Sequence, residues 1–423
     1  MTALLIILIF AIFAALMMTR RMPAILAVPA MAIAIAAVTR TPLHQILNEV
    51  IAAGATRLVE AYLMVFAGAM LGRVVMQTGI AEGIIRRAAE FGGDKPLAVA
   101  ITMMIAVALL FTTLTGLGAV MMVGGLALPI MMSIGVPRKL AGVLFLLAYG
   151  LGYVFNIAAW GFYQKTLNLD PQAVKGFAAA LLLIDAVAII VFLIIAARRM
   201  NRYGAWAVTV EEDKESQQTS KRQVLLVALL IPLLPLALHL GLKWQVTPAF
   251  FASALLGVLI TRPRESVRQL SSAAVRGMED VAPAIILMIG IGMLLNATKL
   301  PAVQASLQPL IQSINFRSPF IYLIVFGLLS PLALYRGPLN PYGIGIGVYS
   351  LIGSLGLLPP PALLAAMMSV VQVQNACDPT NTHNVWVANY VGMRVEDLTR
   401  ETIILKMAVC VAGLIAGIGM YLK

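Results

Sequence analysis

Charged residues are scarce in this 423-residue sequence, at 11%, whereas hydrophobic residues make up 61%. Soluble globular chains contain about 25% charged and about 45–50% apolar residues. A larger core alone does not account for both departures, whereas a surface that faces lipid accounts for both. The sequence therefore predicts an integral membrane protein, with the lipid bilayer as one of its partners.

Cysteine and histidine are also rare, with two and three copies. Cys377 and Cys410 are too few for a disulfide framework and lack the spacing of metal ligands. Gly-x-Gly pairs occur at 150–152 and 343–345, but neither follows a strand and opens a helix, so they do not indicate a phosphate site. We expect no metal site and no organic cofactor, and the missing nucleotide site excludes a primary pump.

The net charge of +12 does not indicate nucleic acid, because the basic residues lie in short loops between apolar segments. The N-terminal apolar stretch has no basic region before it and no clear cleavage site after it, so we interpret it as a retained first helix.

Fourteen apolar segments are long enough to be considered as membrane helices, which need roughly 20 apolar residues. In the first half they cover 3–18, 23–38, 60–77, 97–111, 116–134, 140–164 and 172–197. In the second half they cover 223–242, 247–261, 280–297, 318–335, 341–358, 362–385 and 401–422. The predicted organisation is a first transmembrane repeat at 1–200, a polar cytoplasmic linker at 201–222 and a second transmembrane repeat at 223–423.

Matching residues recur at a nearly constant offset of 220–223 positions, which predicts an internal repeat. The matched pairs are Thr39-Arg40 with Thr261-Arg262, Gly54 with Gly277, Gly68 with Gly290, and Thr78 with Thr298. Because each half has an odd number of segments, the second half enters the membrane from the opposite side. The predicted fold class is therefore all-α, with two inverted-topology repeats.

The distribution of positive charge sets the predicted orientation. If Arg20 and Arg21 are cytoplasmic, alternation of the segments puts 20 of the 30 Lys and Arg residues on that side and 8 on the other. This asymmetry follows the positive-inside rule. It predicts a multi-pass protein of a bacterial cytoplasmic (inner) membrane, with both termini outside.

The fourth and fifth segments of each half are joined by short breaks, at 112–118 and 335–341. These pairs are either re-entrant hairpins or two ordinary spans, and topology alone does not separate the two. We favour hairpins, since proline and glycine interrupt the helix there and non-helical backbone at membrane depth needs protein or a cavity around it. The sixth segment of each half is also interrupted, at 149–156 and 372–384, although the second interruption is also compatible with an ordinary end of a span.

Paired interruptions in inverted repeats indicate a transporter site. Half-helix N-termini suit an anion, and oxygen-bearing side chains at the breaks suit a cation. The predicted substrate-binding residues are Thr113, Thr115, Gly116, Arg336, Gly337, Asn340, Thr380 and Asn381. The predicted cation-coupling residues are Asn156, Gly150, Asn375, Asp378 and Thr382.

Three charged residues within apolar segments need separate consideration. Arg336 either binds the carboxylate of the substrate through its guanidinium fork or has a structural part, by snorkelling or pairing with Asp378. Asp378 binds a sodium ion or carries a proton. Asp185 lies in the middle of a segment, where a hydrogen bond within the scaffold is favoured over a proton relay.

The architecture of short-linked hairpins followed by broken helices resembles the ion transporter superfamily. The stretch 115–125, with Pro129 and Gly135-Val136-Pro137, is similar to the gluconate permease, citrate-metal symporter and C4-dicarboxylate carrier families. The Ser-Asn-Thr signature of dicarboxylate/sodium symporters is absent from both hairpins, although Thr380-Asn381-Thr382 is close to it. The resemblance implies a homodimer with fixed scaffold helices and a transport domain that moves like an elevator.

These features together predict a secondary active transporter that moves a small organic anion, a carboxylate, coupled to sodium or protons. A cation/proton antiporter of the same fold is the alternative. An intramembrane enzyme is a third class, for which only His383 near Asp378 is suggestive, and we expect no enzymatic activity.

Overall fold

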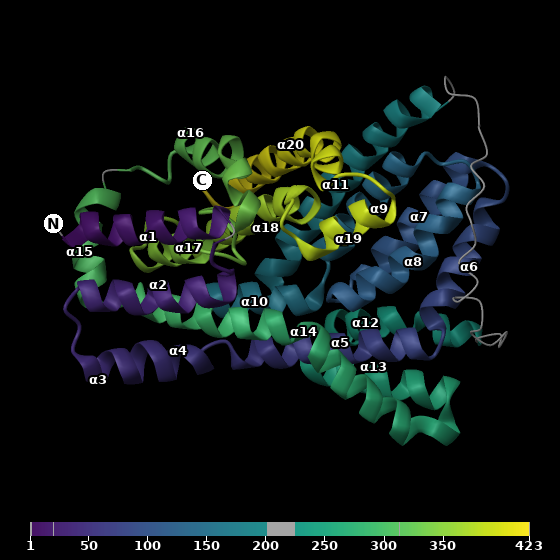
Figure 1. The fold of residues 1–423 in the computed structure, drawn as a ribbon, viewed down its shortest axis with the longest axis horizontal. Helices are drawn as coiled ribbons and strands as arrows, with labels where there is room; N and C mark the ends of the chain where they lie inside the picture. The colour runs from purple at the N-terminus through teal and green to yellow at the C-terminus, as the bar shows by residue number, and fades with distance from the viewer. Residues whose placement is uncertain (1, 20, 201–224, 313, 423) are drawn as a thin grey trace.

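The computed structural model describes residues 2–19, 21–200, 225–312 and 314–422 and is built from helices throughout these ranges (Figure 1). The predicted linker at 201–222 lies outside the described residues. The all-α membrane class predicted from the sequence is confirmed. Within the described residues, five helices are long and apolar enough to cross a membrane, and a bent pair makes a sixth.

The first half begins with two apolar helices and ends with the longest apolar helix of that half. Its elements are α1 (Thr2–Met18), α2 (Ala24–Val38), α3 (Leu43–Gln45), a π-helical turn at Ile46–Ala52, α4 (Ala53–Thr56), α5 (Val59–Gln77), α6 (Ile80–Gly92), α7 (Pro96–Phe111), α8 (Leu117–Ser133), α9 (Arg138–Val154), α10 (Ile157–Leu167) and α11 (Pro171–Met200).

The second half follows a similar order. Its elements are a 3₁₀ segment at Leu226–Leu233, α12 (Leu234–Gly241), α13 (Val246–Thr261), a 3₁₀ turn at Pro263–Glu265, α14 (Ser266–Ala297), α15 (Pro301–Ile311), α16 (Pro319–Tyr322), a π-helical turn at Leu323–Leu328, a 3₁₀ segment at Ser330–Arg336, α17 (Gly345–Ser354), α18 (Pro360–Cys377), α19 (Thr382–Tyr390) and α20 (Val395–Tyr421).

Each of the fourteen apolar segments corresponds to helical structure, and both interrupted segments are broken. The sixth segment of the first half forms α9 and α10, which are bent by 53° at the break. Its counterpart in the second half forms α18 and α19, separated at 378–381. At the second break Pro379 lacks an amide hydrogen and cannot continue the helical hydrogen bonds, whereas at the first break Asn156 caps the start of α10.

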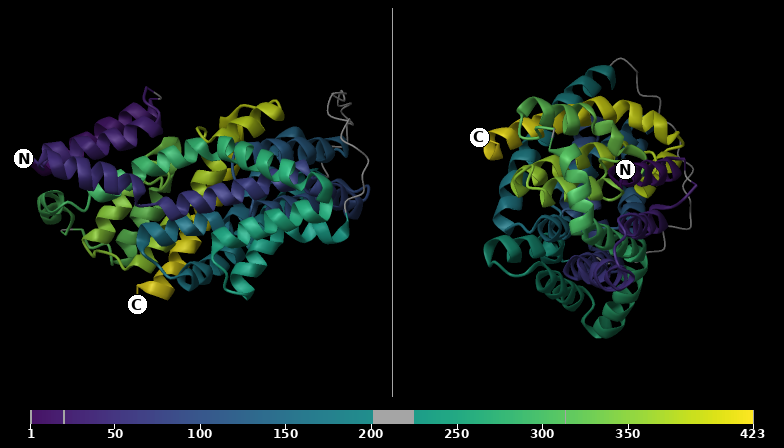
Figure 2. Two further views of the ribbon diagram at one scale, coloured as in Figure 1. Left: turned by 90° about the horizontal axis from the view of Figure 1, so that it is seen from below. Right: turned by 90° about the vertical axis from the view of Figure 1, so that its left-hand side faces the viewer.

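The helices α5 and α14 pack against each other (Figure 1), and the left view of Figure 2 shows the N-terminus at one end of the elongated molecule. Glycines permit the close approach of α14 to α5 and to the neighbouring α4. A Cβ atom on Gly54 would lie 2.7 Å from the Cα of Met293, and one on Gly277 would lie 2.9 Å from the backbone nitrogen of Met70. The two contacts are reciprocal, because Gly54 and Gly277 are also the matched residues of the sequence repeat.

The two helix pairs that flank the predicted hairpin breaks come from opposite ends of the long axis. In Figure 1, α7 and α8 lie toward one end and α16 and α17 toward the other. Their tips, at 112–116 and 335–344, approach the middle of the molecule, where α9–α10 and α18–α19 are broken.

Candidate functional site

A cavity of about 1110 Å³ lies where both hairpin tips and both helix breaks come together. Its wall also includes residues of α2, α5 and α14. Of the predicted site residues, eight line the cavity: Thr115, Gly116, Asn156, Arg336, Asn375, Thr380, Asn381 and Thr382. The remaining five are not in the wall: Thr113, Gly150, Gly337, Asn340 and Asp378.

Asn156 joins the first break to the first tip. Its side-chain amide donates to the carbonyls of Phe111 and Leu114, at 3.0 and 3.1 Å, and its carbonyl oxygen accepts from the nitrogen of Ala159 at 3.1 Å. The first two bonds satisfy backbone carbonyls freed where α7 ends, and the third caps the N-terminus of α10. Asn156 therefore holds the tip and the break in a fixed relationship.

The first tip presents the N-terminus of α8 to the cavity. Gly116 there has φ +89°, a conformation that favours glycine. The hydroxyl of Thr115 in the same tip makes no hydrogen bond with the described residues. Free amides at a helix start attract negative charge.

Asp280 of α14 supplies negative charge beside this tip, since a Cβ atom on Gly118 would lie 2.6 Å from its Oδ1. Arg73 of α5 pairs with the same carboxylate through two hydrogen bonds of 2.6 and 2.5 Å. This bidentate pair lies in the cavity wall and was not predicted, because each residue sits alone in its own segment and the partners are 207 positions apart.

The second tip is held by a fully buried asparagine. Asn340 donates from its side chain to the carbonyl of Ala333 at 2.9 Å and accepts from the nitrogen of Tyr342 at 2.8 Å. Tyr335 and Arg336 have φ of 56° and 58°, the left-handed region that non-glycine residues rarely adopt. The Arg336 guanidinium donates to the carbonyl of Tyr342 at 3.0 Å and lines the cavity.

At the second break, five consecutive carbonyls, of residues 374–378, each accept a hydrogen bond from a side chain. The donors are Asn381 at 2.8 Å, His383 at 2.8 Å, Thr402 at 3.3 Å, Thr399 at 2.8 Å and Asn384 at 2.9 Å. Backbone groups at membrane depth need such internal partners. The polar residues of 381–384 and two threonines of α20 therefore stabilise the broken helix.

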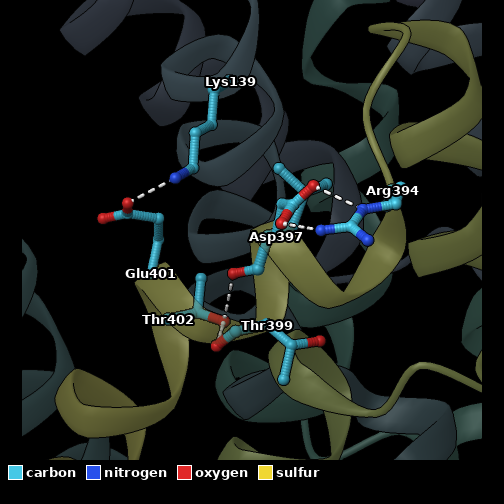
Figure 3. Close-up of polar contacts among 7 residues, drawn as sticks. Lys139, Arg394, Asp397, Thr399, Glu401 and Thr402 are labelled. Atoms are coloured by element: carbon cyan, nitrogen blue, oxygen red, sulfur yellow. Dashed lines mark hydrogen bonds and ion pairs between the residues drawn. The ribbon is translucent and has the colours of Figure 1, made fainter.

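The start of α20, which supplies two of these donors, carries two ion pairs (Figure 3). Arg394 makes two 3.1 Å contacts with the carboxylate of Asp397 within the first turn of the helix, and Lys139 of α9 pairs with Glu401. The second pair links α9 to the turn of α20 that carries Thr399 and Thr402.

Asp378 is fully buried and links the second break to the second tip. Its Oδ1 accepts from the nitrogen of Tyr335 at 3.0 Å, and from the nitrogen and hydroxyl of Thr380 at 2.9 and 2.7 Å. Its Oδ2 accepts no hydrogen bond from the described residues, and neither do Gln374 Oε1 and Asn384 Oδ1. Three buried oxygens around one break thus remain without donors.

Aromatic side chains form one wall of the cavity: Tyr149, Tyr153, Phe162, Tyr335, Tyr342 and His383. The hydroxyls of Tyr153 and Tyr342 are 2.9 Å apart and join the first break to the second tip. These residues were not predicted as site residues, because aromatics at helical spacing in an apolar segment look like core residues.

A buried ion pair lies beside both broken helices. Lys406 of α20 contacts both carboxylate oxygens of Asp185 of α11, at 2.7 and 2.8 Å, and both side chains are fully buried. Gly150 does not line the cavity, and a Cβ atom on it would lie 3.3 Å from the Lys406 ammonium. Asp185 therefore has a charged partner, which the sequence did not reveal.

Comparison with known proteins gives a match in fold. No family model matches the chain, and no curated protein matches it by sequence. Among solved structures, the chain is similar to the YdaH transporter of Alcanivorax borkumensis, whose crystal structure is described as having an unusual topology. The TM-score is 0.58 and the identity 15%, over 100% of this chain and 99% of that chain.

The chain therefore has the fold of a membrane transporter and is a multi-pass membrane protein. The match concerns the fold and does not extend to the gluconate, citrate-metal or C4-dicarboxylate families that the sequence resembles.

Proposed function

We propose that this protein is a secondary active transporter that moves a small organic anion, a carboxylate, across the bacterial cytoplasmic membrane. Transport is coupled to sodium ions or protons, and the protein works as a homodimer in which the hairpins and broken helices move as an elevator past α5 and α14. The observation that carries the proposal is the cavity whose wall combines both hairpin tips, both helix breaks and the guanidinium of Arg336.

The tips supply the groups that an anion needs. Arg336 offers a fork of donors that matches a carboxylate, and it lies beside the backbone of the second tip. The N-terminus of α8 adds partial positive charge from the first tip, where Thr115 has a hydroxyl free to donate. An anion between the tips receives donors from both halves of the chain.

The second break supplies the groups that a cation needs. Sodium prefers hard oxygen ligands. Asp378 Oδ2, Gln374 Oε1 and Asn384 Oδ1 are buried oxygens that receive no hydrogen bond within the described part of the chain. A proton on Asp378 Oδ2 satisfies the same carboxylate. Because Asp378 Oδ1 also accepts from the backbone of Tyr335, charge at Asp378 is linked directly to the tip that carries Arg336.

The test is uptake of radiolabelled organic acids into proteoliposomes that contain the purified full-length protein. Uptake should depend on an imposed sodium or proton gradient and stop when an ionophore removes that gradient. Proton movement driven by sodium or potassium with no organic anion would instead identify the cation/proton antiporter of the same fold. Absence of gradient-dependent uptake of any organic acid would contradict the proposal.

A further inference from the structure

We infer that the transported anion is an aromatic monocarboxylate, held with its carboxylate at Arg336 and its ring against the aromatic wall. This inference rests on the proposed function and adds the substrate class. It comes from the chemistry of the cavity wall, which combines aromatic rings, adaptable apolar side chains and few free positive charges.

The aromatic wall continues across two halves of the protein. The ring of Tyr149 lies 4.8 Å from that of Phe111, 5.9 Å from that of Tyr153 and 4.5 Å from that of His383. Across the hydroxyl contact between Tyr153 and Tyr342, the ring of Tyr342 lies 5.0 Å from that of Phe162. These spacings are typical of favourable aromatic pairs, and a planar ring in the cavity extends the same pattern.

The cavity lining also contains apolar side chains, with methionine prominent among them. Residues of the α1–α2 region and of α14 contribute them: Met17, Met22, Ile25, Leu287, Met288 and Ile291. Unbranched methionine side chains adjust to the outline of an apolar ligand and make favourable contacts with aromatic rings. A ligand with an apolar ring therefore finds both aromatic and adaptable apolar partners in the cavity lining.

The charges in the wall favour one carboxylate and oppose several. Among the described residues of the cavity wall, the two arginines, Arg73 and Arg336, face three carboxylates, Glu279, Asp280 and Glu396. Arg73 already directs two donors to Asp280. Arg336 is then the guanidinium left to receive the substrate, and one fork binds one carboxylate. A second or third negative charge on the ligand meets like charge.

The test compares benzoate, cyclohexanecarboxylate, succinate and citrate on the full-length protein in proteoliposomes. Benzoate and cyclohexanecarboxylate are similar in size and charge but differ in aromaticity. We expect uptake of labelled benzoate, and about three- to tenfold weaker competition by cyclohexanecarboxylate, the range that one aromatic contact supplies. Succinate and citrate should not compete at the same concentrations.

Variants of the wall should change this preference. Tyr149→Leu removes a ring, so the half-inhibitory concentrations of benzoate and cyclohexanecarboxylate should become similar. Tyr149→Phe keeps the ring and should retain the preference for benzoate. Tyr153→Leu gives a second measurement on another ring of the wall. Tyr421→Leu is the matched control, since this tyrosine pairs with Phe177 outside the cavity.

Different outcomes separate this inference from the proposed function. Gradient-driven uptake of succinate or citrate without uptake of benzoate would overturn the substrate class and leave the organic-anion transporter standing. Equal competition by benzoate and cyclohexanecarboxylate would overturn the aromatic assignment. Absence of uptake for every acid would overturn both.

Discussion

Asp185 and Lys406 form a fully buried ion pair, and they are 221 positions apart in the sequence. This separation falls within the offset of 220–223 that relates the two halves of the sequence. The two partners therefore occupy matching positions in the repeat that the sequence predicts. The pair joins α11 to α20, and Lys406 also lies within hydrogen-bonding distance of Gln372 on the broken helix α18.

Removal of one partner of this pair should destabilise the protein far more than removal of both. Lys406→Met or Asp185→Leu leaves a buried charge unpaired, which costs about 3–5 kcal/mol, whereas an apolar replacement of the whole pair is often neutral. Thermal unfolding in detergent, followed by size-exclusion fluorescence, measures the difference. The double variant should melt close to the native protein, and a double variant that melts as low as the singles would contradict the pairing.

Asp378 should be needed for coupling. Asp378→Asn retains an acceptor for the nitrogen of Tyr335 but loses the charge, so the variant should fold and lose gradient-driven uptake. The control is Asp397→Asn, which removes the same charge from the surface ion pair between Arg394 and Asp397 and should transport normally. The measurement is uptake with and without the gradient at equal protein in the vesicles. Full dependence on the gradient in Asp378→Asn would rule out this role.

Hydropathy was sufficient to predict the apolar helices, because lipid exposure imposes long apolar segments. Amphipathic helices were not predicted, because their charged residues interrupt the apolar pattern that hydropathy detects. The helix α6 and the first part of α14 carry charged residues, so they do not resemble membrane segments although they pack on them. The sequence offset matched Gly54 with Gly277 as small residues. It did not indicate that Gly54 lies against the backbone of Met293, which only the structure shows.

Breaks in the helices were predictable, because proline and polar residues stand out within apolar segments. The sequence did not indicate which of these residues face the cavity. Asn340 and Asp378 proved to be buried behind the wall, where they hold the tip, and Gly150 faces Lys406. The Arg73–Asp280 pair was not predictable, because it forms between segments that are distant in sequence.

Arg336 should bind the carboxylate of the substrate. Arg336→Lys keeps the charge but loses the fork, so one charge-assisted hydrogen bond worth roughly 1.5–3 kcal/mol is lost. Affinity should fall about tenfold to a hundredfold, and further in Arg336→Ala. Substrate titration of purified, monodisperse protein measures the affinity. The control is Arg394→Lys, which makes the same exchange in the surface ion pair between Arg394 and Asp397. The structural alternative follows from the hydrogen bond to Tyr342: it predicts unstable variants whose folded fraction binds normally.

Gly277 should not tolerate a larger side chain, whereas Gly176 should. Both lie within helices, so exchange for alanine brings the same backbone gain of roughly 0.5–1 kcal/mol. At Gly277 the new Cβ would lie 2.9 Å from the nitrogen of Met70, and backbone cannot yield as a flexible side chain does. At Gly176 nothing lies within 4 Å. Gly277→Ala should therefore lower the melting temperature in detergent and Gly176→Ala should leave it unchanged or raise it. Equal melting temperatures for the two variants would show that α5 and α14 are not in such close contact.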